Sequence, residues 1–127
     1  MTKILLAEDD VFIGEIYATV LKKEGFDVRT AVDGEEALTL ARNNMDASLM
    51  LLDIMMPKLN GVEVLKQLKA DPQTKDLPII LLTNLSDDNI IQEALHLGAV
   101  AYLIKVRFTP QAVVEKIREF LEFKTLQ

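Results

Sequence analysis

Cysteine is absent from this sequence, which excludes disulfide bonds and thiolate metal sites. Long apolar runs are also absent, since no stretch approaches the roughly 18 residues that a membrane-spanning helix needs. No signal peptide is expected, because Met1, Thr2 and Lys3 lead directly into a strand-like segment. These features predict a cytoplasmic protein that does not contact a membrane.

Positive charge is in the minority. The chain has 14 Lys and Arg against 20 Asp and Glu, a formal net charge of −6, and its basic residues form no block. Direct binding to nucleic acid is therefore not expected, because it depends on clustered cationic side chains. The single histidine, His96, belongs to no cluster of metal ligands and is predicted to be a partly exposed helix residue.

Apolar residues are plentiful, at 50% of the 127 residues, which is enough for one domain with a sizeable core. We expect a single domain over residues 1–123, followed by a C-terminal tail at 124–127. No repeat, low-complexity segment or long linker divides the chain.

Strand-like and helical segments alternate along the whole chain. Strands are expected at residues 3–7, 26–30, 49–52, 79–83 and 100–104, each followed by residues with helical spacing. This alternation predicts an α/β fold with a parallel sheet covered by helices on both faces. The expected architecture is a flavodoxin-like, doubly wound (βα)5 domain with strand order 2-1-3-4-5.

Local signals mark where several helices begin and end. Asp33 and Ser86 are predicted to cap the second and fourth helices, and Gly25 is predicted to end the first in the left-handed conformation. The first helix is expected to bury an apolar stripe that consists of Ile13, Ile16, Tyr17, Val20 and Leu21.

Polar side chains follow four of the predicted strands. Glu8 and Asp9 follow the first strand, Asp53 the third and Lys105 the fifth, while Thr83 ends the fourth. The carboxyl ends of parallel strands meet at one edge of a sheet, and ligands bind in the crevice where the strand order reverses. We therefore expect these five side chains to converge there.

The chemistry of such a cluster points to phosphoryl transfer. Two carboxylates about 4 Å apart repel by roughly 4 kcal/mol at an effective dielectric near 20, so a cation should accompany them. Mg²⁺ prefers oxygen ligands of this kind, and a carboxylate nucleophile beside Mg²⁺, a lysine and a hydroxyl suits phosphoryl transfer. Taken singly, the acidic run could be a solvated loop and Asp53 a helix cap; their joint placement at successive strand ends favours a site.

Four segments resemble the receiver domain of two-component response regulators, in particular the chemotaxis-regulator type. They are Ile4–Asp10, Leu51–Pro57 with Gly61, Ile80–Thr83 and Ala101–Lys105. The resemblance covers about residues 2–123. It implies a signalling domain rather than an enzyme acting on other substrates.

The resemblance also implies roles for individual residues. Asp53 would accept a phosphoryl group from the histidine of a sensor histidine kinase or histidine phosphotransfer protein. Mg²⁺ (or Mn²⁺) would be bound by Glu8, Asp9, Asp53 and the backbone carbonyl of Met55. By the same resemblance, the output would be a downstream protein partner or an output domain.

Further implied roles belong to the fourth and fifth strands. Thr83 and Lys105 would contact the phosphoryl oxygens, and Tyr102 would turn inward as Thr83 shifts. The signal would be read at the fourth helix, fifth strand and fifth helix. The first helix, near Phe12, Ile13 and Tyr17, is expected to be part of the face that docks the kinase.

Two positions depart from the usual pattern of the family. Val106 stands where a proline, often preceded by a cis bond, usually follows the lysine. A cis bond before a residue other than proline costs about 2.5–4 kcal/mol, so the Lys105–Val106 bond is predicted to be trans. Asn84 is larger than the small residue common after the threonine, and we hypothesise that it partly covers the phosphorylation pocket and alters hydrolysis.

Other functions fit the sequence less well. A phosphatase of the haloacid-dehalogenase type needs a second acid two residues after its nucleophile, where this chain has Met55. A flavin-binding module would need a hydroxyl- and glycine-rich phosphate loop after the first strand, where this chain has acids. A receiver that folds without being phosphorylated is disfavoured by the complete set of acceptor, acids, threonine and lysine.

Overall fold

The computed structural model describes residues 1–126, with side chains described through residue 123. Its centre is one parallel sheet with the order β2-β1-β3-β4-β5, which confirms the order predicted from the sequence. The strands are β1 (Lys3–Ala7), β2 (Asp27–Ala31), β3 (Leu49–Leu52), β4 (Ile79–Thr83) and β5 (Ala101–Ile104).

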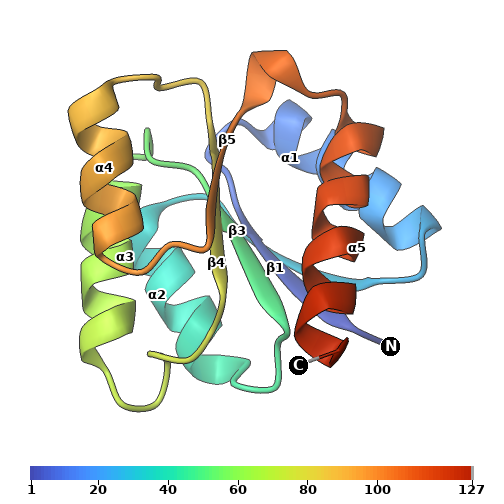
Figure 1. Cartoon of the computed structure of the whole chain (residues 1–127), viewed down its shortest axis with the longest axis horizontal. Helices are drawn as coiled ribbons and strands as arrows, with labels where there is room; N and C mark the ends of the chain where they lie inside the picture. The colour runs from blue at the N-terminus through green and yellow to red at the C-terminus, as the bar shows by residue number, and fades with distance from the viewer. Residues whose placement is uncertain (127) are drawn as a thin grey trace.

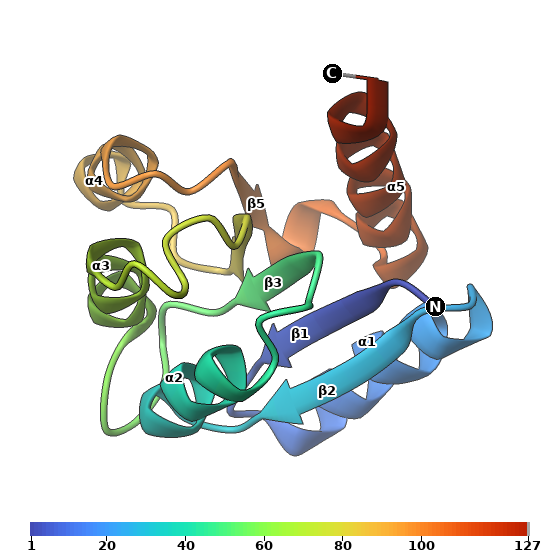
Figure 2. The ribbon, with the colours of Figure 1, turned by 90° about the horizontal axis from the view of Figure 1, so that it is seen from below.

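Helices cover both faces of this sheet. They are α1 (Val11–Lys23), α2 (Gly34–Asn43), α3 (Gly61–Ala70), α4 (Asp88–His96) and α5 (Pro110–Leu126), with a short 3-10 helix, η1 (Lys105–Arg107), between β5 and α5. Figures 1 and 2 show α1 and α5 on one face and α2, α3 and α4 on the other. Helix α5 continues past residue 123, where the predicted tail begins.

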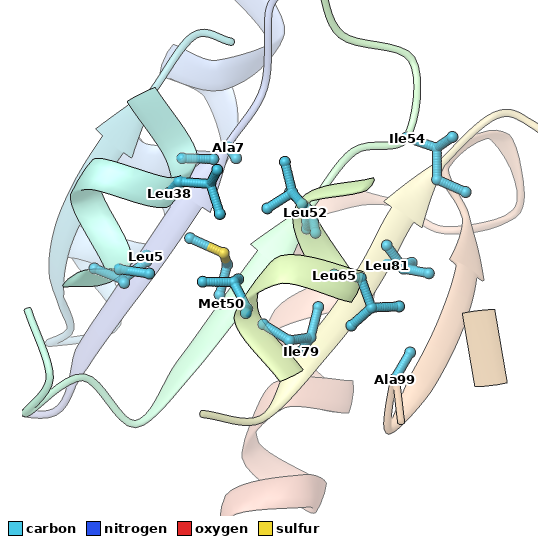
Figure 3. Close-up of a cluster of buried hydrophobic side chains, with 14 of the residues drawn as sticks. Leu5, Ala7, Leu38, Met50, Leu52, Ile54, Leu65, Ile79, Leu81 and Ala99 are labelled. Atoms are coloured by element: carbon cyan, nitrogen blue, oxygen red, sulfur yellow. The ribbon is translucent and has the colours of Figure 1, made fainter. Parts of the chain in front are cut away.

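Two clusters of apolar side chains form the core, one on each face of the sheet. Figure 3 shows the first, in which alternate residues of three strands (Leu5, Met50 and Ile79 among them) meet Leu38 of α2 and Leu65 of α3. The strand residues of opposite parity form the second cluster, where they pack with α1 and with Val113 and Ile117 of α5. These strand residues are Ile4, Leu6, Leu49, Leu51, Ile80 and Leu82. Each fully buried leucine contributes about 1.5–3 kcal/mol. Burial on both faces explains why β3 and β4 lack polar alternation.

The predicted helix ends are confirmed at two of three positions. Asp33 caps α2 by accepting the Glu36 amide at 2.8 Å, and Gly25 adopts a φ of 93° after α1. The prediction for Ser86 is wrong, because Asp87 caps α4 and its Oδ1 accepts two backbone amides. A carboxylate at this position also gains from the positive end of the helix dipole, which a serine does not.

The predicted buried stripe of α1 is wrong at one residue. Tyr17, Ala18 and Leu21 face the sheet, whereas Ile16 is 52% exposed. Successive helical residues are about 100° apart, so seating Tyr17 and Ala18 on the sheet turns Ile16 outward. Phe12, one turn earlier, is 80% exposed on the same helix.

Within residues 1–126, no helix combines the length and the apolar character that crossing a membrane requires.

Candidate functional site

The pairing of β1 with β3 brings the predicted acids together. Ala7 and Leu52 are partners across the two strands, and the Asp53 amide donates to the Ala7 carbonyl at 3.1 Å. Glu8 and Asp53 therefore leave neighbouring strands at the same level. The crevice at this sheet edge lies between the first and third strands, as the strand order predicts.

Three carboxylates meet in this crevice. Glu8, Asp9 and Asp53 each offer an oxygen, and these oxygens all lie within 4.8 Å of one another. Glu8 and Asp53 are only 5% and 6% exposed, while Asp9 is exposed at the rim. Hard carboxylate oxygens on an accessible rim fit Mg²⁺, which binds one or two carboxylates and retains several waters. The donor set therefore fits the ion predicted from the sequence.

Lys105 reaches the same carboxylates from the end of β5. Its Nζ lies 2.8 Å from Asp53 Oδ2 and also contacts Glu8 Oε1 directly. The side chain is 11% exposed. Lys105 was expected in this cluster, but its direct contact with Glu8 was not predicted, because that contact depends on the conformation of a long side chain. In the described structure this ammonium offsets the repulsion between two buried acids.

Burial changes the acid–base properties of this group. Burial raises the pKa of Glu8 to about 7, although the nearby Lys105 ammonium acts in the opposite direction. Burial alone would lower the pKa of Lys105, but its hydrogen bonds to Asp53 and Glu8 outweigh this and raise its pKa above the ordinary value. Lys105 is consequently a stable cation near neutral pH, whereas Glu8 changes charge there.

The loop after β3 folds back over Asp53. The Met55 amide donates to Asp53 Oδ1 at 3.2 Å, and the Gly61 amide donates to the Ile54 carbonyl at 2.9 Å. A Cβ added to Gly61 would lie 2.3 Å from the Asp53 carbonyl oxygen. The absence of a side chain therefore lets the start of α3 approach the backbone of Asp53. The backbone of Met55 therefore lies beside the acid, with its amide directed to Asp53.

Thr83 and Tyr102 are linked through the backbone of Leu85. Thr83 is wholly buried at the end of β4, and its Oγ1 accepts the Leu85 amide at 3.4 Å. The Tyr102 hydroxyl donates to the Leu85 carbonyl at 2.6 Å. Leu85 was not singled out from the sequence, and backbone groups give no sequence signal by which it could have been found.

The bond after Lys105 is trans, as predicted, since residues 1–126 contain no cis peptide bond. The Val106 amide donates to Asn84 Oδ1 at 3.0 Å. A proline at this position would lack the donor. Val106 and Asn84, the two residues that depart from the family pattern, are thus in direct contact.

The comparison with known families agrees with this geometry. The model of the response regulator receiver domain matches residues 4–118, which include every predicted site residue. The chain belongs to the response regulator receiver domains. A receiver domain is a signalling module of two-component systems rather than a classical enzyme, so the phosphatase and flavin alternatives are set aside.

Relatives of this receiver domain include transcriptional regulators and chemotaxis proteins. The CpxR homolog of Haemophilus influenzae, a transcriptional regulatory protein, is 40% identical over 121 residues, which are 95% of this chain and 51% of that protein. The chain thus spans about half the length of the curated relatives it matches. Chemotaxis protein CheY4 of Vibrio cholerae has a similar structure, with a TM-score of 0.85, 30% identity and coverage of 94% of this chain and 98% of that chain.

A further similar structure contains a metal ion. The CheX–CheY–BeF3–Mg²⁺ complex from Borrelia burgdorferi has a TM-score of 0.86 and 25% identity, and the match covers 94% of this receiver domain and 89% of that chain. The receiver domain described above therefore has an acidic cluster suited to Mg²⁺ and a relative whose complex includes that ion.

Proposed function

We propose that this receiver domain is a phosphorylation-activated switch that accepts a phosphoryl group on Asp53. The donor would be the phosphohistidine of a sensor histidine kinase or a histidine phosphotransfer protein. The observation that carries the proposal is the position of Asp53, buried at a strand end between two other carboxylates and the Lys105 ammonium.

The proposed transfer step involves the Asp53 carboxylate and the donor phosphohistidine. A carboxylate oxygen of Asp53 attacks phosphorus, and the new P–O bond forms as the P–N bond to the donor histidine breaks. The imidazole leaves and takes up a proton. Hydrolysis by water later regenerates the carboxylate and releases inorganic phosphate, so the domain catalyses only its own phosphorylation and dephosphorylation.

Glu8, Asp9, Asp53 and the backbone carbonyl of Met55 would hold Mg²⁺ (or Mn²⁺). The bound ion would supply positive charge that offsets the charge of the phosphoryl oxygens. The clustered carboxylates support this set, and Mg²⁺ in the similar Borrelia complex supports the choice of ion.

Lys105 and Thr83 would contact the phosphoryl oxygens. Lys105 already donates to Asp53 Oδ2, so its ammonium is near the atoms that gain charge during transfer. The Thr83 hydroxyl acts as an acceptor toward Leu85 and retains its proton for donation. Together they would provide a fixed positive charge and a hydrogen-bond donor beside the buried Asp53.

Tyr102 would couple the site to α4 and β5. Its hydroxyl donates a hydrogen bond to the Leu85 carbonyl, and the Leu85 amide donates one to Thr83. A shift of Thr83 toward a phosphoryl oxygen would release the Leu85 amide and so alter the backbone that holds the tyrosine. Phosphorylation would then shift the population between two packings of this segment, because the two make different contacts with the phosphoryl group.

The partners would bind at separate surfaces. The exposed apolar side chains of Val11, Phe12 and Ile16 on α1 follow the acidic crevice directly and support this helix as part of the kinase-docking face. The output would be read at α4, β5 and α5 by a downstream protein or an output domain of a longer regulator. A domain supplied by such a kinase would act in the cytoplasm.

Intact mass spectrometry tests the proposed function. After incubation with Mg²⁺ and a small phosphodonor such as phosphoramidate, we expect one phosphoryl adduct per chain. Excess chelator should suppress the adduct, because the acids would then face the phosphoryl group without the metal. An adduct that forms equally well with chelator would contradict the metal requirement.

Mg²⁺ affinity is expected to increase as the pH rises toward about 7 and to level off above it. Glu8, whose pKa burial raises from 4.5 to about 7, must lose its proton before it can bind a cation. In the metal-free protein, a rise in pH has the opposite effect on the contribution of Glu8 to folding stability: it lowers this contribution. The native state holds this proton more tightly, so the contribution of Glu8 to stability is full below pH 4.5 and is lost as the pH rises through about 7.

Calorimetric titration with Mg²⁺ across about pH 5.5–8.5 measures this dependence. In Glu8→Gln the rise in affinity through this range should disappear, since glutamine does not titrate. Glu15→Gln, at an exposed position of α1, is the matched control and should retain the rise. The same pH profile in Glu8→Gln and wild type would exclude Glu8 as its source.

Tyr102→Phe is expected to leave phosphorylation by a small donor within about twofold of wild type but to weaken the response of α4. Losing the 2.6 Å bond to Leu85 removes a contact that favours the present packing. One such bond changes a two-state ratio by about fivefold. Backbone amide shifts, recorded by NMR before and after phosphorylation, measure the response. Tyr17→Phe is the control, and equal shifts on α4 in wild type and Tyr102→Phe would argue against the switch.

A further inference from the structure

One hydrogen bond joins the residue that follows Thr83 to the residue that follows Lys105. Asn84 directly follows β4, Val106 directly follows Lys105, and the Val106 amide donates to Asn84 Oδ1 at 3.0 Å. Both loops lie at the carboxyl edge of the sheet, at the top of Figure 1. The contact therefore connects the residues next to the two side chains that would hold the phosphoryl group.

The contact satisfies a donor that local structure leaves unpaired. The first amides of a helix have no partner within the helix, and η1 begins without a side-chain cap of its own. At the end of η1, the Lys105 carbonyl accepts the Phe108 amide at 3.1 Å. An asparagine 22 residues earlier supplies the missing acceptor for Val106. The start of η1 is thereby tied to the end of β4.

We propose that Asn84 is a positioning residue for the chemistry at Asp53, acting through Val106 to hold Lys105 in place. The proposal rests on the proposed function of the domain. Where the family usually has a proline with a fixed φ after the lysine, this chain has a residue with free φ and an amide donor. The hydrogen bond instead holds the Val106 amide, next to Lys105, against the residue that follows β4.

This role differs from the hypothesis that Asn84 covers the pocket. Its Oδ1 is directed to the Val106 amide, so the side chain is committed to the neighbouring loop. The two roles predict different behaviour for Asn84→Leu. Leucine has a similar branched outline to asparagine and is somewhat larger, so it would still cover a pocket, but it cannot accept a hydrogen bond.

The test compares Asn84→Leu, Asn84→Ala and Asn84→Asp with wild type and with Asn43→Leu, a matched exposed asparagine on α2. We expect phosphorylation by phosphoramidate to be slower by about threefold to tenfold in both Asn84→Leu and Asn84→Ala, the factor that one neutral hydrogen bond supplies. The affinity for Mg²⁺ should remain within about twofold of wild type, because Asn84 contacts none of the carboxylates.

Hydrogen exchange at the Val106 amide, followed by NMR, reports the contact itself. Protection of this amide should fall about tenfold in the Leu and Ala variants and be retained in Asn84→Asp, which keeps the acceptor oxygen. Unchanged protection in Asn84→Leu, or lost protection with a wild-type rate, would overturn the positioning role. A wild-type phosphorylation rate in Asn84→Leu with a faster rate in Asn84→Ala would also overturn it, because this is the result expected if Asn84 only covers the pocket. Failure of wild type to be phosphorylated would instead overturn the proposed function.

Discussion

Replacing Lys105 with methionine is expected to slow phosphorylation of Asp53 by about a hundredfold or more, the usual effect of removing one preorganised charge or donor from a reaction site. The ammonium lies 2.8 Å from Asp53 Oδ2 and contacts Glu8, so no other described side chain replaces it there. Methionine keeps much of the length and apolar packing of the lysine stem. Rates with a small phosphodonor, followed by intact mass, measure the effect.

The same substitution should strengthen Mg²⁺ binding. Lys105 is a cation held against two of the three carboxylates, and removing it ends its competition with the metal. A severalfold lower dissociation constant is expected, since even screened charges this close interact by about 1–4 kcal/mol. A slower phosphorylation together with tighter Mg²⁺ binding would indicate the loss of a phosphoryl contact. A collapsed site would instead lower both the phosphorylation rate and the affinity for Mg²⁺. Lys23→Met, at an exposed position of α1, should change neither, and weaker Mg²⁺ binding in Lys105→Met would contradict this account.

Gly61→Ala is expected to destabilise the fold by about 3 kcal/mol and to lower Tm by about 10 °C. The new Cβ would lie 2.3 Å from the Asp53 carbonyl oxygen and 2.7 Å from the Ile54 Cα, and both atoms belong to backbone. Backbone cannot move aside as a flexible side chain can, so the start of α3 and the loop beside Asp53 must shift. Phosphorylation should slow as well, because Asp53 lies on the displaced segment. Thermal unfolding and the phosphodonor assay measure the two effects.

Gly14→Ala provides the control with the opposite sign. The added Cβ would meet only Glu8 Cγ and Cβ, at 3.8 and 3.9 Å, which is ordinary contact. Since glycine inside a helix is less favourable than alanine by about 0.5–1 kcal/mol, this variant should be slightly more stable than wild type. Equal Tm values for Gly61→Ala and Gly14→Ala would mean that the close approach at Gly61 has no energetic consequence.

The sheet and the convergence of the acids could be predicted from sequence because they follow from periodicity. Apolar runs such as 49–52 and 79–83 indicate strands buried on both faces, and their alternation with helices leaves few topologies. Once the order is known, the carboxyl ends of the strands share an edge. The proximity of Glu8 and Asp53 can then be predicted without any knowledge of side-chain conformation. The pairing of Ala7 with Leu52 confirms that the two acids follow neighbouring strands at the same level.

Contacts that depend on conformation could not be predicted in this way. The contact of Lys105 with Glu8 depends on how a long side chain crosses the crevice, and the sequence gives only its starting point. The link from Thr83 to Tyr102 passes through the backbone of Leu85, whose side chain carries no signal of it. Whether Ser86 or Asp87 caps α4 depends on the residue at which the helix begins, and the helix begins at Asp88.

The departure at Val106 illustrates both cases. The trans bond followed from the energetic cost of a cis bond before a residue other than proline, and it is confirmed. The partner of the Val106 amide did not follow from anything local, since Asn84 lies 22 residues earlier. This hydrogen bond can be identified only from the structure, in which the ends of β4 and β5 lie side by side.

The most direct measurement of the central claim is the intact mass of Asp53→Asn beside wild type after incubation with Mg²⁺ and phosphoramidate. Asparagine keeps the size of the side chain but offers no carboxylate oxygen to attack phosphorus. Asp46→Asn, at an exposed aspartate in the loop after α2, is the matched control. We predict one phosphoryl adduct on wild type and on Asp46→Asn, and none on Asp53→Asn. An adduct of the same yield on Asp53→Asn would contradict the assignment of Asp53 as the phosphoryl acceptor.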